Sequence, residues 1–133
     1  MPFLIDTNVI SDFVRSNEGV IKNLHKISPS EVFISSITLM EIKYGLLLNP
    51  EKAIKIEPVI NDLISAIHVL PFTEKEAVIT AQVRSFLKSS GKPIGPFDLL
   101  IAATSITHQL IMVTANFREF LQVPNLQVVN WRT

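Results

Sequence analysis

Short apolar runs alternate with stretches of helical periodicity along this chain. Residues 3–5, 32–34, 68–70 and 110–113 are short, mostly apolar and bounded by turn-forming or helix-capping residues, which is typical of strands, and the first two runs are typical of buried strands. Residues 127–129 form a fifth candidate strand. Runs without polar alternation indicate strands that are covered on both faces. The pattern therefore predicts an α/β fold with a central, mainly parallel sheet of four or five strands, flanked by helices on both faces.

The stretches between these runs predict helices. Apolar positions recur at helical spacing over residues 20–27, 36–45 and 51–66, and again over 74–87. A further helix is expected to begin near Phe97 or Asp98, after a loop that is rich in glycine and proline. Strands and helices thus follow one another along the whole chain.

Two local signals refine the helix predictions. Pro58 lies inside the stretch 51–66, so this helix is either kinked there or restarts with Pro58 in its first turn. Thr73 with Glu76 has the spacing of a capping box and predicts the start of the following helix.

Composition narrows the class of protein. The chain has 133 residues, of which 47% are hydrophobic, and this predicts one globular domain with more apolar surface than a single core absorbs. We therefore expect a protein partner or a dimer. Twelve basic residues balance twelve acidic ones, which argues against nucleic-acid binding by bulk charge but permits a local basic patch.

Two absences restrict the chemistry and the location. The chain has no cysteine, so a disulfide framework, a thiolate nucleophile and a cysteine-ligated metal are excluded, and any metal would rest on oxygen or imidazole ligands. Asp6 interrupts the apolar N-terminus, and no run of eighteen apolar residues follows. We expect a cytoplasmic protein without membrane association.

Acidic residues recur where strands end or helices begin. Each has an ordinary structural alternative: a helix cap, an exposed helix residue, a first-turn acid or a surface residue. Because ligands of parallel α/β sheets bind beyond the carboxyl ends of the strands, their joint placement predicts a shared site. The acids are Asp6, Glu41 and Asp98, with Glu119 as a possible fourth.

A cluster of carboxylates indicates a particular chemistry. Carboxylates without cysteine or histidine suit hard cations, so the sequence predicts Mg²⁺, with Mn²⁺ as the alternative. Such ions can bind a phosphate ester and lower the pKa of an attacking water, and no covalent enzyme nucleophile is then required. The three histidines, His25, His68 and His108, share no ligand spacing and are not expected to bind a metal.

Four segments of the chain resemble the four conserved blocks of PIN domains, in order and at the expected spacing. They are DTNVIS at 6–11, SITLMEIKYG at 36–45, IGPFDLLIAA at 94–103 and VTANFREF at 113–120. The closing segment LQVVNW at 126–131 is similar to that of the VapC toxins. The resemblance spans nearly the whole chain and implies a single PIN domain over residues 1–133.

The resemblance implies a function and a set of roles. It implies a Mg²⁺-dependent endoribonuclease that cleaves tRNA or another structured RNA as the toxin of a toxin–antitoxin pair. It also implies a homodimer that a VapB-like antitoxin inhibits, with a higher toxin–antitoxin assembly as an alternative. The four acids named above take the catalytic and metal-binding positions, and Asn8 and Thr114 match positions that orient the acids or water. Asn116 stands where many relatives of the wider fold carry an acid, so the fourth contact lies between Asn116 and Glu119.

Basic residues near the four segments are candidates for contacts with RNA phosphates. They are Arg15, Lys43, Lys92 and Arg118.

Other classes of protein fit less well. A haloacid-dehalogenase phosphatase needs a second aspartate two residues after Asp6, and that position is Asn8. A response-regulator receiver domain would place a lysine after a late strand, where this chain has Thr114, Ala115 and Asn116, and it gives no reason for Glu41. The remaining alternative is a non-catalytic PIN scaffold that binds RNA or a protein partner.

Overall fold

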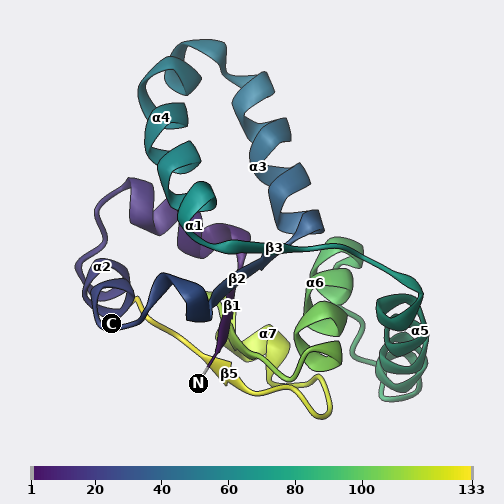
Figure 1. Ribbon diagram of the computed structural model, residues 1–133. Coiled ribbons are helices and arrows are strands. Elements are labelled where there is room, and N and C mark those ends of the chain that lie inside the picture. The colour runs from purple at the N-terminus through teal and green to yellow at the C-terminus, as the bar shows by residue number, and fades with distance from the viewer. Residues whose placement is uncertain (1, 133) are drawn as a thin grey trace.

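A five-stranded parallel sheet forms the centre of the computed structural model, which describes residues 2–132 (Figure 1). The strand order is β3-β2-β1-β4-β5, so the first strand lies in the middle, where Leu4 pairs with Phe33 and with Met112. This confirms the predicted parallel sheet. The strands are β1 (Phe3–Ile5), β2 (Val32–Ser35), β3 (His68–Leu70), β4 (Ile111–Val113) and β5 (Val128–Val129).

Helices connect the strands and cover both faces of the sheet. They are α1 (Thr7–Val14), α2 (Glu18–His25), α3 (Ser36–Leu48), α4 (Pro50–Ala66), α5 (Glu74–Ser89), α6 (Pro96–Thr107) and α7 (Phe117–Phe120), with a 3-10 turn, η1, at Pro29–Glu31. The prediction of a helix over 20–27 was wrong at both ends, because Asn17 caps the helix by accepting a hydrogen bond from Val20 N, and the helix ends at His25. The other predicted helices are present, with small differences at their ends.

Side chains of β1, β2, β4 and β5 alternate between two hydrophobic cores, whereas in the edge strand β3 only Leu70 packs against a core and His68 and Val69 are exposed. Ile5 and Val113 point into the core that α1, α2, α3 and α4 cover, whereas Leu4 and Met112 point into the core beneath α5, α6 and α7. The alternation follows from the two-residue period of a strand. Both cores contain fully buried side chains, which explains why the strands carry continuous apolar runs.

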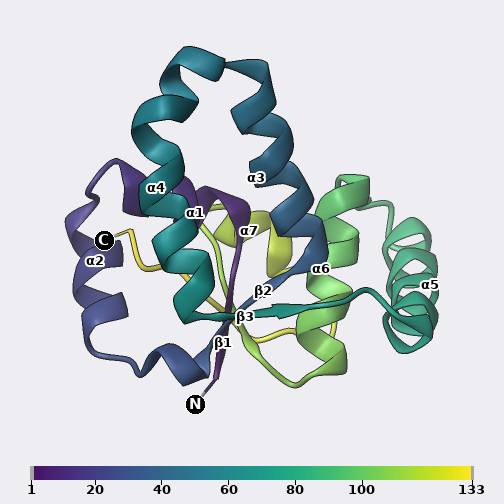
Figure 2. The same ribbon diagram turned by 45° about the horizontal axis from the view of Figure 1, so that its top comes forward.

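Helices α3 and α4 form a hairpin that projects from the sheet (Figures 1 and 2). Asn49 ends α3 and caps α4, since its side-chain oxygen accepts a hydrogen bond from Lys52 N at 3.2 Å, and Pro50 follows as the first residue of α4. The alternative that a new helix starts at Pro58 was wrong, because α4 continues through Pro58. Pro58 and Ile54 are exposed, so water can replace the backbone donor that the proline lacks.

The predicted capping box at the start of α5 is confirmed and connects to α6. The buried Glu76 carboxylate accepts hydrogen bonds from the backbone N (2.7 Å) and the hydroxyl of Thr73, and its other oxygen lies 3.1 Å from His108 Nε2 at the end of α6. Burial raises the pKa of Glu76, but the bonds from Thr73 outweigh it, so the pKa lies below its ordinary value. This contact fixes α5 against the helix that carries Asp98.

The segment after β5 packs across α1 and α2. The Trp131 ring is buried with its centre 5.3 Å from that of Phe3, and the Arg132 guanidinium donates two hydrogen bonds, of 2.9 and 3.0 Å, to the Asp12 carboxylate. Gly19 in α2 lies directly beneath the Trp131 carbonyl, where a β-carbon would come within 2.2 Å of the oxygen. The segment therefore closes over a helix position at which only glycine fits. None of the helices within residues 2–132 combines the length and apolar character needed to cross a membrane.

Candidate active site

The four predicted acids lie at the edge of the sheet where parallel strands end. Asp6 follows β1, and the elements that carry the other three acids, α3, α6 and α7, lie around this end of β1 (Figure 2). Asp6, Glu41, Asp98 and Glu119 are called the acidic cluster below. The charge of each of the other three acids raises the pKa of Asp98, so the four groups are close enough to interact.

Asp6 is held rigidly at the centre of the acidic cluster. It is buried, and its Oδ1 accepts a hydrogen bond from Thr7 N at 2.8 Å, so it also caps α1. Its Oδ2 accepts bonds from the Thr114 hydroxyl at 2.8 Å and from Asn8 Nδ2 at 3.2 Å. The capping role and the site role that the sequence suggested for Asp6 are therefore compatible in one residue.

Asn8 and Thr114 connect the ends of β1 and β4. The Asn8 side-chain oxygen accepts a hydrogen bond from Ala115 N at 3.0 Å, and the Thr114 hydroxyl accepts one from Asn116 N at 3.0 Å. Both residues also bond to Asp6, so they determine how its carboxylate is oriented. Their predicted supporting positions agree with these contacts.

Glu41 is positioned by a threonine that the sequence did not single out. The Thr7 hydroxyl donates a 2.6 Å hydrogen bond to Glu41 Oε1 and lies 3.4 Å from the Thr38 hydroxyl, which Ser35 contacts in turn. Thr7 lies between Asp6 and Asn8 in the segment DTNVIS at 6–11. A hydroxyl directly after the first acid was the sequence signal that could have indicated its role. The contact itself joins residues 34 positions apart.

Asp98 and Glu119 meet at the start of α6. Gly95 occupies the N-cap position and offers no capping side chain, and Asp98 lies in the first turn of α6, so Asp98 is a first-turn acid and not the helix cap. Glu119 Oε1 accepts a 3.4 Å hydrogen bond from Gly95 N, and the charge of Glu119 is among the causes that raise the pKa of Asp98. This arrangement places Glu119 directly beside Asp98.

The acidic cluster is electrostatically strained. Burial, followed by the charges of Asp6, Glu119 and Glu41, raises the pKa of Asp98 to about 6. Burial also raises the pKa of Asp6, although the bonds from Thr114 and Thr7 oppose this, and the charges of Glu41 and Glu119 add to the increase. Such mutual repulsion is relieved by protonation or by a cation.

The donor set fits a hard divalent cation in its chemistry. All four side chains offer carboxylate oxygens, and no positively charged side chain forms an ion pair with any of them among residues 2–132. Over the same part of the chain, no group of three or more acidic or histidine side chains is arranged closely enough to hold one ion as it stands. The carboxylates thus surround a shared space without converging on one point.

The other predicted site residues lie further out. Asn116 is exposed, begins α7 and makes no side-chain capping bond. Lys43 lines a separate hollow with Leu47 and Ile54, while Lys92 and Arg118 are exposed. Arg15 alone of the four predicted basic residues lines a cavity together with Glu41.

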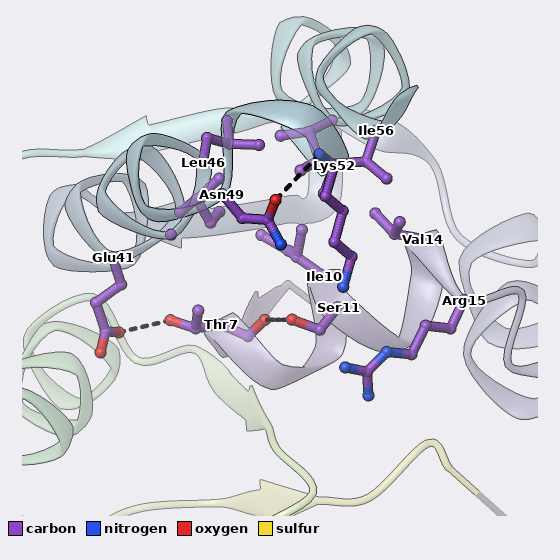
Figure 3. A pocket seen from close by; sticks show the side chains of 13 residues that line it. Thr7, Ile10, Ser11, Val14, Arg15, Glu41, Leu46, Asn49, Lys52 and Ile56 are labelled. Carbon is purple, nitrogen blue, oxygen red and sulfur yellow. Dashed lines mark hydrogen bonds between the residues drawn. The ribbon is translucent and has the colours of Figure 1, made fainter. Parts of the chain in front are cut away.

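That cavity is a groove between α1 and the α3–α4 hairpin, with a volume of about 280 Å³ (Figure 3). It begins at Thr7 and Glu41 and extends past Ser11 to Arg15 and Lys52. Lys52 was missed by sequence reasoning, because only the fold brings the start of α4 over α1. The edge of the sheet that carries the acidic cluster therefore continues into this open groove on one side.

Comparisons with known proteins agree with this architecture. A family model described as PIN domain matches residues 3–126. The chain is 34% identical to the tRNA(fMet)-specific endonuclease VapC of Salmonella typhimurium over 98% of both chains, and 39% identical to toxin FitB of Neisseria gonorrhoeae over 88% of this chain and 89% of FitB. The crystal structure of VapBC2 from Rickettsia felis bound to a DNA fragment from its promoter contains a chain that superposes with a TM-score of 0.90 at 28% identity, covering 98% of this chain and 99% of that one.

Proposed function

This chain belongs to the PIN-domain family, among its VapC ribonucleases, and we propose that it cleaves tRNA or another structured RNA as the toxin of a toxin–antitoxin pair. The observation that supports this most strongly is the acidic cluster, in which carboxylates from four distant segments meet at one edge of the sheet and raise the pKa of Asp98. A non-catalytic scaffold gives no reason for four carboxylates to repel one another at one site. In an enzyme that binds a cation there, the cation relieves this repulsion.

PIN-domain ribonucleases generally use a divalent metal, and we propose Mg²⁺ here, with Mn²⁺ as the alternative. Asp6 and Asp98 would hold the ion together with Glu41 and Glu119, since these are the carboxylates of the cluster. When bound, the metal would polarise the scissile phosphate and lower the pKa of the attacking water. Glu119 rather than Asn116 completes the set, because Glu119 lies beside Asp98 and Asn116 is exposed.

The residues around the cluster hold it in place. Thr114 and Asn8 orient Asp6 through its Oδ2, and Thr7 orients Glu41. Groups that are oriented before substrate binds lose less free energy to reorganisation during reaction. Asn116, at the exposed start of α7, is available to position a water or the RNA.

Cleavage of purified tRNA tests the proposed function directly. We expect fragments when the purified chain is incubated with total tRNA and MgCl₂, none with excess EDTA, and recovered cleavage when MgCl₂ is then added in excess. The products are separated on a denaturing gel. Intact RNA at every Mg²⁺ and Mn²⁺ concentration, with RNA still bound in a gel-shift assay, would instead establish the non-catalytic scaffold.

Replacing Thr7 with valine tests whether Glu41 must be positioned. Thr7→Val keeps the shape of the side chain but removes the donor to Glu41, and we expect cleavage to fall by about tenfold or more. Thr7→Ser retains a hydroxyl and should keep most of the activity. If initial rates of cleavage of a labelled tRNA are equal in Thr7→Val and wild type, the contact has no functional role.

A VapB-like antitoxin is the proposed protein partner, because the chain resembles toxins whose solved structures are toxin–antitoxin complexes. The homodimer, or a higher assembly with the antitoxin, stays a prediction. The α3–α4 hairpin offers exposed apolar side chains of the kind that such contacts use: Tyr44, Leu47, Leu48 and Ile54. An RNA substrate together with the absence of a membrane-spanning helix in residues 2–132 leads us to propose the cytoplasm as its location.

A further inference from the structure

One wall of the groove beside Glu41 is a polar stripe on α1. Thr7, Ser11 and Arg15 follow one another at intervals of four residues, so they lie on one face of the helix. The rise of an α-helix places Arg15 roughly 12 Å along the axis from Thr7. The stripe thus leads from the acidic cluster to a guanidinium group.

The opposite wall brings a second cation to the same place. Lys52 in the first turn of α4 lines the groove, and its side chain extends across it toward α1, near Ser11 (Figure 3). Asn49 holds this turn of α4 by capping Lys52 N. Arg15 and Lys52 therefore come from segments 37 positions apart and face one channel.

Neither cation forms an ion pair with a residue in the described part of the chain. Among residues 2–132, the ion pairs are Arg132 with Asp12 and His108 with Glu76, and neither involves Arg15 or Lys52. Arg15 and Lys52 are both exposed, so their charged groups remain accessible to a ligand in the groove. Of the described residues that line the groove, Glu41 alone carries a carboxylate; it lies at the other end of the groove and is hydrogen-bonded to Thr7.

This charge arrangement suits an RNA strand whose scissile phosphate lies at the acidic cluster. Four carboxylates repel a phosphodiester, and the chain as a whole has a net charge of zero, so affinity for RNA must come from cations placed near the site. Phosphates follow one another at regular spacing along an RNA strand, and a second phosphate can meet cations displaced along a groove.

We propose that Arg15 and Lys52 form a phosphate-binding subsite that holds the RNA backbone beside the scissile phosphate. This inference rests on the proposed function and identifies positioning residues for it. Arg15 can bind phosphate oxygens through two parallel N–H donors, and Lys52 contributes a mobile point charge. The apolar wall of the groove, which includes Ile56 and Ile60, faces sugar and base rather than phosphate.

The test measures RNA binding without cleavage. Arg15→Gln and Lys52→Gln are introduced singly and together into an Asp98→Asn parent, and the Kd for a labelled tRNA is measured with Mg²⁺ at several salt concentrations. We expect each single variant to weaken binding by about five- to tenfold, and the slope of log Kd against log salt to decrease by about one per cation removed.

Control variants separate this role from an effect on folding. Lys55→Gln removes an exposed cation one turn further along α4 that does not line the groove, and its Kd and salt slope should match those of the parent. Lys52→Arg should keep most of the affinity, whereas Arg15→Lys should keep the salt slope but lose part of the affinity, because lysine lacks the second parallel donor. In the otherwise wild-type chain, Lys52→Gln should raise KM for tRNA while kcat changes less than about twofold.

Each outcome decides a different point. A parent protein that binds no tRNA would overturn this inference, and the cleavage assay above would decide the proposed function separately. A parent that binds tRNA, with unchanged Kd and salt slope in the Arg15→Gln, Lys52→Gln double variant, would overturn only the subsite. In that case the groove serves another occupant, such as a protein partner.

Discussion

Replacing Asp98 with asparagine is expected to reduce RNA cleavage by about a hundredfold or more and to stabilise the metal-free protein. The amide keeps the size of the side chain but removes the charge that a cation needs, so activity is lost. The same change removes one of four mutually repelling carboxylates, so the folded state gains stability when no metal is present. A variant that simply folds less well would lose both cleavage activity and stability, so a loss of cleavage with a gain in stability distinguishes the proposed effect from misfolding.

The stability gain should depend on pH in a defined direction. The pKa of Asp98 is raised from 3.8 to about 6 in the folded protein, so the folded state binds the proton more tightly than the unfolded state. The stability from this protonation is fully present below about pH 4 and is lost as pH rises through about 6. The asparagine side chain of Asp98→Asn does not titrate, so the difference in free energy of unfolding between this variant and wild type should grow between pH 4 and pH 7. Because Asp98 is partly exposed, water screening limits the gain to about 1 kcal/mol, which corresponds to an increase in Tm of about 3 °C.

Thermal unfolding in EDTA at pH 4, 6 and 7.5, monitored by circular dichroism, measures this effect. Asp62→Asn is the matched control, since Asp62 is an exposed acid on α4 outside the cluster, and its difference from wild type should be small at each pH. A Tm difference between Asp98→Asn and wild type that is constant from pH 4 to 7.5 would contradict the proposed repulsion. Undiminished cleavage by Asp98→Asn would show that the site is assigned wrongly.

Replacing Gly19 with alanine should cause the largest loss of stability among single changes outside the cores. The new β-carbon would lie 2.2 Å from the Trp131 carbonyl oxygen and 3.0 Å from two further backbone atoms of Arg132, and backbone atoms cannot move aside as a flexible side chain can. The segment must then lift, which weakens the packing of Trp131 on Phe3 and the bonds from Arg132 to Asp12. We expect a loss of roughly 2–4 kcal/mol and a Tm lower by about 10 °C.

Gly45→Ala is the matched control for this prediction. Gly45 also lies inside a helix, α3, but a β-carbon there meets nothing within 4 Å. Alanine has the higher helix propensity, so this variant should be more stable than wild type by about 0.5–1 kcal/mol. Denaturant unfolding of both variants decides the point. A Gly19→Ala protein that is as stable as Gly45→Ala would mean that the segment after β5 is not held against α2.

The sheet and the position of the acidic cluster could be predicted from the sequence for a local physical reason. Strands buried on both faces need continuous apolar runs, and such runs in alternation with helices leave few arrangements other than a parallel sheet. In that sheet the carboxyl ends of all strands lie at one edge, so acids that follow strands are brought together there. This does not depend on how the helices pack on the sheet. Asp6 and Glu119 could be placed in this way, and the roles of all four acids stay proposals that the experiments above test.

Contacts between distant segments depended on the tertiary structure. Thr7 holds Glu41, and Lys52 faces Arg15, only because α1, α3 and α4 pack in one particular orientation, and helical periodicity does not specify which exposed side chains will meet. The same limit applies to Gly19, whose neighbour Trp131 is 112 positions away. The sequence by itself determined where the strands lie along the chain and the edge where carboxylates gather, since these follow from local hydrophobic pattern and strand direction. Only the tertiary structure decided which side chains orient those carboxylates and which cations flank them, since such distances are determined by how the helices pack.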